Sequence, residues 1–117
     1  MKNYLFVMRH LPHISAHVQE TLDQMLTAAV FDQSVSVLFA DDGVFQIKQG
    51  QIPAMTLKNT AAMLLALEMY DIKKLYVEAE SLSERGLTAN DLMMKMELIS
   101  RADVGEMIKR HDVVISD

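Results

Sequence analysis

Residues 34–51, SVSVLFADDGVFQIKQGQ, are the stretch that decides the fold. Residues 34–39 alternate between serine and valine and then run into leucine and phenylalanine, which predicts a strand buried on at least one face. We expect this strand to end at Asp41. Asp41, Asp42 and Gly43 have turn chemistry, because aspartate can bond its own backbone and glycine accepts positive φ.

The segment after this turn carries apolar side chains on a stretch too short for a full helix. Val44, Phe45 and Ile47 follow the turn, and Gly50 and Pro53 interrupt the chain beyond them. Two interpretations are open. The apolar side chains pack on the domain's own core, or they lie against another chain, because loops at the carboxyl ends of strands often carry sites. The second interpretation makes Val44, Phe45 and Ile47 candidate interface residues.

Apolar runs alternate with amphipathic runs through the rest of the chain. We expect strands at residues 4–8, 75–79, 93–98 and 112–116, with helix as an alternative for the methionine-rich run 93–98. A helix of about sixteen residues follows Ser15, a second covers residues 57–70, and a third begins near Ser100. Residues 81–86 are expected to form a loop. The pattern predicts an α/β fold, a three-layer α/β/α domain with a mostly parallel sheet of about five strands.

The second and third predicted helices carry further local signals. Residues 61–67, AAMLLAL, are apolar on every side, and a helix of that kind is difficult to bury inside a small domain. We therefore expect Ala61, Leu64 and Leu65 to contact another subunit. In the third helix, Ser100 and Asp103 resemble a capping box. One face of that helix is expected to hold its apolar residues: Val104, Met107 and Ile108.

The composition restricts the possible functions. A chain of 117 residues has the size of a single domain, expected to span residues 1–117. Its apolar fraction of 50%, with ten methionines, points to a partner surface. The net charge of −5, with scattered lysine and arginine, disfavours direct binding of nucleic acid.

The sequence contains no cysteine. It therefore has no disulfide, no thiolate nucleophile and no residue that could carry a persulfide. The apolar run at residues 4–8 is too short for a signal peptide or a membrane span, so we expect a cytoplasmic location.

Three histidines lie close together in sequence, at His10, His13 and His17. Zinc needs convergent ligands, and Pro12 and the helix start at Ser15 divide these residues between a loop and a helix. We interpret them as loop and surface histidines and predict no metal and no cofactor. An anion-binding or capping role for His13 beside the helix start is a second possibility.

Three carboxylates cluster at the end of the third predicted strand, at Glu78, Glu80 and Glu84. The carboxyl end of a strand is the usual site region of an open α/β sheet, but we interpret these residues as a solvated rim. The chain carries no G-x-S-x-G, P-loop or G-x-G-x-x-G motif. No catalytic residues are predicted, and independent catalysis has no support in the sequence.

Residues 40–51 resemble a segment of TusC-like proteins, A-D-G-V-F-Q-x-x-x-G-Q, in the DsrE/DsrF-like family of sulfur-relay proteins. Four more segments fall in line with the same family: the opening strand, the Pro12-His13 loop, residues 67–72 (L-x-L-Y-D-I) and residues 81–87 (S-L-x-E-R-G-L). Together these segments cover most of the chain and are specific as a set. The resemblance implies the same α/β fold.

The resemblance also implies a function. The chain would be a non-catalytic subunit that assembles with TusB-like and TusD-like chains into a heterohexamer. That complex takes sulfur from a TusA-like donor and passes it to a TusE-like acceptor, for 2-thiolation of the wobble uridine of tRNA. In TusD-like and DsrE-like relatives the sulfur-accepting cysteine corresponds roughly to Glu78, and a carboxylate cannot form a persulfide.

Three alternatives stay open. The chain could be a homo-oligomeric ligand-binding or signalling module that uses the loops around Asp41 and Glu78. It could be a metal enzyme that uses its three clustered histidines. Its relatives of the DsrF type imply a role in sulfur oxidation instead of tRNA thiolation.

Overall fold

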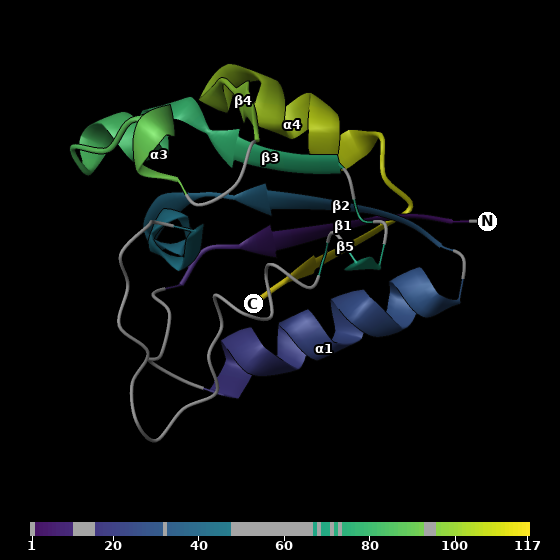
Figure 1. Ribbon diagram of the computed structural model, residues 1–117. Helices are drawn as coiled ribbons and strands as arrows, with labels where there is room; N and C mark the ends of the chain where they lie inside the picture. Colours follow the sequence, from purple (N-terminus) through teal and green to yellow (C-terminus); the bar gives the residue numbers. More distant parts are fainter. Residues whose placement is uncertain are drawn as a thin grey trace.

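The computed structural model describes residues 2–10, 16–31, 33–47, 67, 69–70, 72, 74–92 and 96–117 (Figure 1). In chain order the elements are β1 (Asn3–Met8), α1 (Ala16–Val30), β2 (Ser34–Phe39), η1 (Asp41–Ile47), β3 (Lys74–Glu78), α3 (Ala79–Glu84), η2 (Ala89–Asp91), β4 (Glu97–Ile99), α4 (Arg101–Lys109) and β5 (Val113–Ser116). Strands and helices alternate, as predicted.

The five strands form one parallel sheet in the order β4-β3-β2-β1-β5. At its centre, Val37 of β2 pairs with Phe6 of β1 and with Leu75 of β3. Because all the strands run in one direction, their carboxyl ends meet at one edge, where η1 and α3 begin (Figure 1). The prediction of an α/β fold with a parallel sheet is confirmed.

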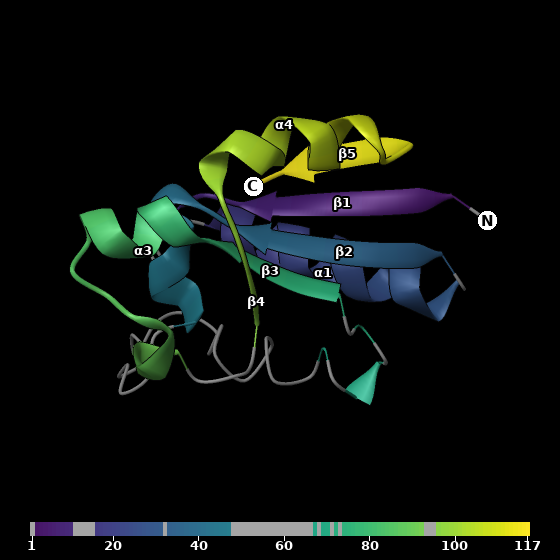
Figure 2. The ribbon, with the colours of Figure 1, turned by 90° about the horizontal axis from the view of Figure 1, so that it is seen from above.

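Helices cover both faces of the sheet. Figures 1 and 2 place α1 on one face and α4 on the other. On the first face, Leu22 and Met25 of α1 pack with Phe6 and Val37. On the second, Met107 of α4 packs with sheet residues that include Leu38. The central strand β2 is therefore buried on both faces, which is why even its polar Ser36 is only 3% exposed.

The turn predicted after β2 is a 3₁₀-helix. β2 ends at Phe39, two residues before the predicted end, and η1 begins at Asp41. Asp41 has a φ of 51°, in the left-handed region, which a strand residue does not adopt. The backbone therefore turns away from the sheet at this residue.

The prediction of a loop at residues 81–86 is wrong. Helix α3 starts directly after β3, and its residues Ser81 and Leu82 are buried in the interior. The helix ends before Gly86, whose φ of 70° is the left-handed conformation that favours glycine.

Near the carboxyl terminus the predictions are met in part. β4 is Glu97–Ile99, which confirms a strand at the end of run 93–98, although residues 93–95 lie outside the described residues. At α4 the Ser100 hydroxyl donates to Asp103 Oδ2 at 3.0 Å, so it does not cap the backbone. Met107 is buried as predicted, but Ile108 is 40% exposed.

Several predicted features lie outside the described residues. They are most of the second helix, with Ala61, Leu64 and Leu65, together with Pro12, His13 and Ser15. Within the described part of the chain, no helix is long and apolar enough to span a membrane.

Candidate functional site

The carboxyl edge of the sheet brings together the charged residues that follow β1 and β2. Arg9 comes after β1, and its Nε and terminal nitrogen both lie 2.9 Å from Asp41 Oδ2. Gly43 sits so close to the end of β1 that a Cβ there would overlap the Met8 carbonyl oxygen. Only glycine therefore allows η1 to pack against β1 at this point.

Glu78, the last residue of β3, is the buried acid of this edge, with 5% of its surface exposed. Its Oε1 accepts hydrogen bonds from Ser81 Oγ at 2.6 Å and from Arg101 Nε at 2.9 Å. Ser81 Oγ in turn accepts the Asp41 N–H at 2.8 Å. One hydroxyl thus joins the end of β2 to the end of β3.

Arg101, the first residue of α4, is the cation around which the acidic residues gather. Its terminal nitrogens donate to the two Glu84 oxygens at 2.8 and 3.2 Å, and its backbone N–H donates to Glu80 Oε1 at 2.9 Å. The hydrogen bonds to Glu84 and Glu78 raise the pKa of Arg101 above its usual value. The same guanidinium lowers the pKa of Glu84.

Two further contacts extend this arrangement to its sides. Arg85 Nε donates to Asp42 Oδ1 at 3.1 Å, which joins α3 to η1. On the other side, Asp117 Oδ1 accepts the Arg9 N–H at 2.8 Å and lies 3.0 Å from His10 Nδ1. The Asp117 side chain is fully buried, so the carboxyl terminus is held beside β1.

We call the connected set the carboxyl-edge network; its members are Arg9, Asp41, Asp42, Glu78, Ser81, Glu84, Arg85 and Arg101. Its chemistry is structural, because the buried Glu78 carboxylate and the buried Ser81 hydroxyl are both bonded to other members of the network. Ser81 is 0% exposed, so its hydroxyl cannot meet a substrate in this conformation. Among the described residues, no group of His, Asp and Glu side chains could hold a metal ion.

The prediction of a solvated rim at Glu78, Glu80 and Glu84 is wrong for Glu78, which is buried. All three carboxylates converge on Arg101: Glu78 and Glu84 accept from its guanidinium, and Glu80 accepts from its backbone N–H. Sequence reasoning missed that arginine, because it lies 23 positions from Glu78 and approaches it from a different element. Its place at the first position of a helix was the only available signal.

The predicted interface residues fall into three groups. Val44 and Ile47 are 0% exposed and belong to the chain's own core. Phe45 is partly buried and packs against the same core. Contact with a partner stays a prediction for Phe45 and for the three residues of the second helix, which lie outside the described residues.

The histidines do not form a described cluster. His10 lies beside Asp117, His13 is outside the described residues, and only the backbone of His17 is described, in α1.

Other proteins are similar to this chain over nearly its whole length. The profile of the DsrE/DsrF-like family matches residues 2–116. A protein named TusC homolog from Pseudomonas aeruginosa is 37% identical over 116 residues, 98% of each chain. A TusC homolog from Vibrio parahaemolyticus is 34% identical over 99% of each chain. The intracellular sulfur oxidation protein DsrF of Allochromatium vinosum is 34% identical, over 99% of this chain and 96% of that protein.

Solved structures share the fold. The ychN protein from E. coli superposes with a TM-score of 0.85 at 17% identity, and the matched region covers 100% of both chains. MTH1491 from Methanobacterium thermoautotrophicum, described as a protein of unknown function, superposes over 100% of both chains with a TM-score of 0.74 at 13% identity. From its sequence match over residues 2–116 and its full-length relatives, the chain belongs to the DsrE/DsrF-like family.

Proposed function

We propose that this chain is a non-catalytic subunit of a cytoplasmic sulfur-relay complex of the TusBCD type, which supports 2-thiolation of the wobble uridine of tRNA. Full-length similarity to proteins named TusC homolog supports this proposal. The matched span covers 98–99% of the chain.

The observation that carries the proposal is the residue that occupies the carboxyl end of β3. This place holds Glu78, whose carboxylate is buried and is bonded to Ser81 and Arg101. A carboxylate cannot carry sulfur as a persulfide, and the sequence has no cysteine elsewhere. Sulfur would therefore be carried by a cysteine of another subunit, and this chain would support that subunit.

The proposed partners are TusB-like and TusD-like chains in a heterohexamer, with a TusA-like donor and a TusE-like acceptor acting on the complex. Large exposed apolar side chains support contact with other proteins: Phe31 is 71% exposed and Met69 is 86% exposed. The net charge of −5 supports an indirect relation to tRNA.

The first test is co-expression with a TusB-like and a TusD-like chain, followed by native mass spectrometry of the purified assembly. We expect one complex with equal amounts of the three chains. The chain expressed alone is the control for self-association. Recovery of this chain free of both partners at micromolar concentration would contradict the proposal.

The second test concerns tRNA. In a strain that lacks this gene, we expect 2-thiouridine at the wobble position to fall, as measured by mass spectrometry of tRNA nucleosides. The intact gene should restore it. Unchanged thiouridine would remove tRNA thiolation from the proposal.

A second candidate function is a DsrF-like role in sulfur oxidation, supported by the 34% identity to the Allochromatium vinosum protein. The same deletion strain distinguishes the two. Unchanged thiouridine, with slower oxidation of reduced sulfur compounds, would favour this candidate.

A further inference from the structure

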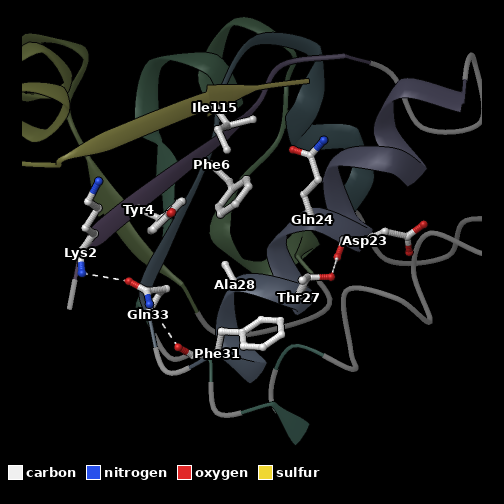
Figure 3. Close-up of a pocket in the computed structure, with 10 residues that line it drawn as sticks. All are labelled: Lys2, Tyr4, Phe6, Asp23, Gln24, Thr27, Ala28, Phe31, Gln33 and Ile115. Carbon is white, nitrogen blue, oxygen red and sulfur yellow. Dashed lines mark hydrogen bonds between the residues drawn. The ribbon is translucent and has the colours of Figure 1, made fainter.

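An open groove lies between helix α1 and the β1–β5 side of the sheet. Its volume is about 790 Å³, and Figure 3 shows apolar side chains of both layers facing into it. Tyr4, Phe6 and Ile115 come from the sheet, Ala28 comes from the last turn of α1, and Phe31 directly follows that helix. The rings of Tyr4 and Phe6 stack at 6.2 Å between centroids, which gives the groove a flat aromatic wall.

Phe31 is the most exposed large apolar residue that lines this groove. It directly follows α1, and 71% of its side chain is exposed to water. Large aromatic side chains are the residues that dominate binding energy when a partner covers them.

The groove lies along an open edge of the sheet. β5 is the outermost strand and pairs with β1, and no strand of the described residues pairs with its other side. Alternate backbone N–H and C=O groups of an edge strand point away from the sheet and can accept another strand. β5 reads Val113-Val114-Ile115-Ser116, without the lysine or proline that commonly protects such an edge.

A positive charge stands at one end of the groove. Lys2 precedes β1, and its backbone N–H donates to Gln33 Oε1 at 2.9 Å, which holds the Lys2 backbone in place (Figure 3). Among the described residues, no carboxylate forms an ion pair with its ammonium group. Asp23 of α1 also lines the groove, on the side away from Lys2 (Figure 3), so the groove favours an occupant whose acidic side chain lies at the Lys2 end.

We propose that the groove and β5 bind an extended segment of a partner protein, which adds a strand to the sheet at β5. Alternate side chains of that segment are apolar and enter the groove against Phe6 and Phe31, and one carboxylate meets Lys2. This is recognition by strand addition: main-chain hydrogen bonds hold the segment, and side-chain pockets select it. The inference rests on the proposed function, because the partner is another subunit of the sulfur-relay complex.

Hydrogen exchange of the purified complex tests the strand. In the free chain, the amides of residues 113–116 that face away from β1 should exchange quickly. In the complex of this chain with TusB-like and TusD-like chains, we expect these amides to exchange at least about tenfold more slowly.

Matched variants test the groove. Phe31→Asp and Lys2→Glu should each weaken assembly about tenfold or more in a titration of this chain with the TusB-like and TusD-like pair. Ile108→Asp and Lys109→Glu make the same changes on α4, across the sheet, and should bind within about twofold of the unmodified chain. Circular dichroism checks that each variant is folded.

The outcomes separate the inference from the proposed function. If the complex forms but the outer amides of β5 keep their fast exchange, or the two pairs of variants bind alike, strand addition is wrong and the subunit role stands. If no complex forms with either chain, the subunit role fails and the inference fails with it. A dimer of the chain alone that Phe31→Asp dissociates would place a second copy in the groove and overturn the assignment to a different subunit.

Discussion

Replacing Ser81 by alanine tests whether one buried hydroxyl holds the carboxyl-edge network together. The Ser81 side chain donates to the Glu78 carboxylate at 2.6 Å and accepts the Asp41 N–H at 2.8 Å, in a position that is 0% exposed. A hydrogen bond to a charged acceptor contributes about 1.5–3 kcal/mol. The Asp41 N–H is only partly buried, so water can satisfy it and its loss adds little. The better helix propensity of alanine returns roughly 0.5 kcal/mol.

We therefore expect Ser81→Ala to lower the free energy of unfolding by about 2 kcal/mol. At this chain length that is a fall in Tm of roughly 8 °C, since a protein of this size loses about 4 °C per kcal/mol. Urea denaturation of the purified chain at pH 7 measures the change. Ser83→Ala is the matched control, because Ser83 lies in the same helix and is exposed.

The comparison has a clear refuting result. If Ser81→Ala and Ser83→Ala unfold within about 0.5 kcal/mol of each other, the hydroxyl is not a structural link between β2 and β3. A double-mutant cycle with Glu78→Gln locates the interaction. We expect the two changes to be coupled by roughly 1 kcal/mol, whereas additive effects would show that the Ser81–Glu78 bond contributes nothing of its own.

Four other substitutions test further parts of the structure. Gly43→Ala should lower the free energy of unfolding by about 1–3 kcal/mol, because its methyl group meets the backbone of β1. Gly105→Ala, in open space on α4, should instead raise it by roughly 0.5–1 kcal/mol in the same urea denaturation assay. Arg101 lowers the pKa of Glu84 from its usual 4.5, so the stabilisation by this ion pair is complete above that pH and disappears as the pH falls through the lower folded-state pKa. Glu84→Gln should therefore flatten the pH dependence of urea unfolding below about pH 4.5, and parallel curves for the two proteins would contradict this. Phe45→Asp should weaken assembly with TusB-like and TusD-like chains, and an unchanged native mass of the complex would show that Phe45 is not at the interface.

The carboxyl-edge network and the groove beside β5 lie in different parts of the molecule. The network joins η1, α3 and α4 at the ends of the strands, whereas the groove lies between α1 and the outer strands. Substitutions such as Ser81→Ala and Phe31→Asp should therefore act on stability and on assembly separately.

Much of the fold was accessible from local patterns. The alternation in residues 34–39 predicted β2, and the amphipathic run after Ser15 predicted α1, because burial of one face leaves a period of two or of 3.6 in the sequence. The location of a site region after the third strand also followed from pattern, since parallel strands end at one edge.

Other features depended on contacts between distant residues. Residues 81–86 were expected to form a loop because they are mostly polar. Ser81 and Leu82 are nevertheless buried, because α3 packs at the end of β3. Val44 and Ile47 were candidate interface residues until the position of η1 placed them in the core.

The sequence by itself determined the α/β class, the absence of any sulfur-carrying cysteine and the family to which the chain belongs. Each of these follows from residue identities and local periodicity. The tertiary structure decided the strand order, the burial of Glu78 against Arg101 and the groove beside β5. These features depend on which elements become neighbours in the fold. The arrangement of the elements is determined by the total apolar surface that packing buries, and this total cannot be calculated from any single segment of the sequence.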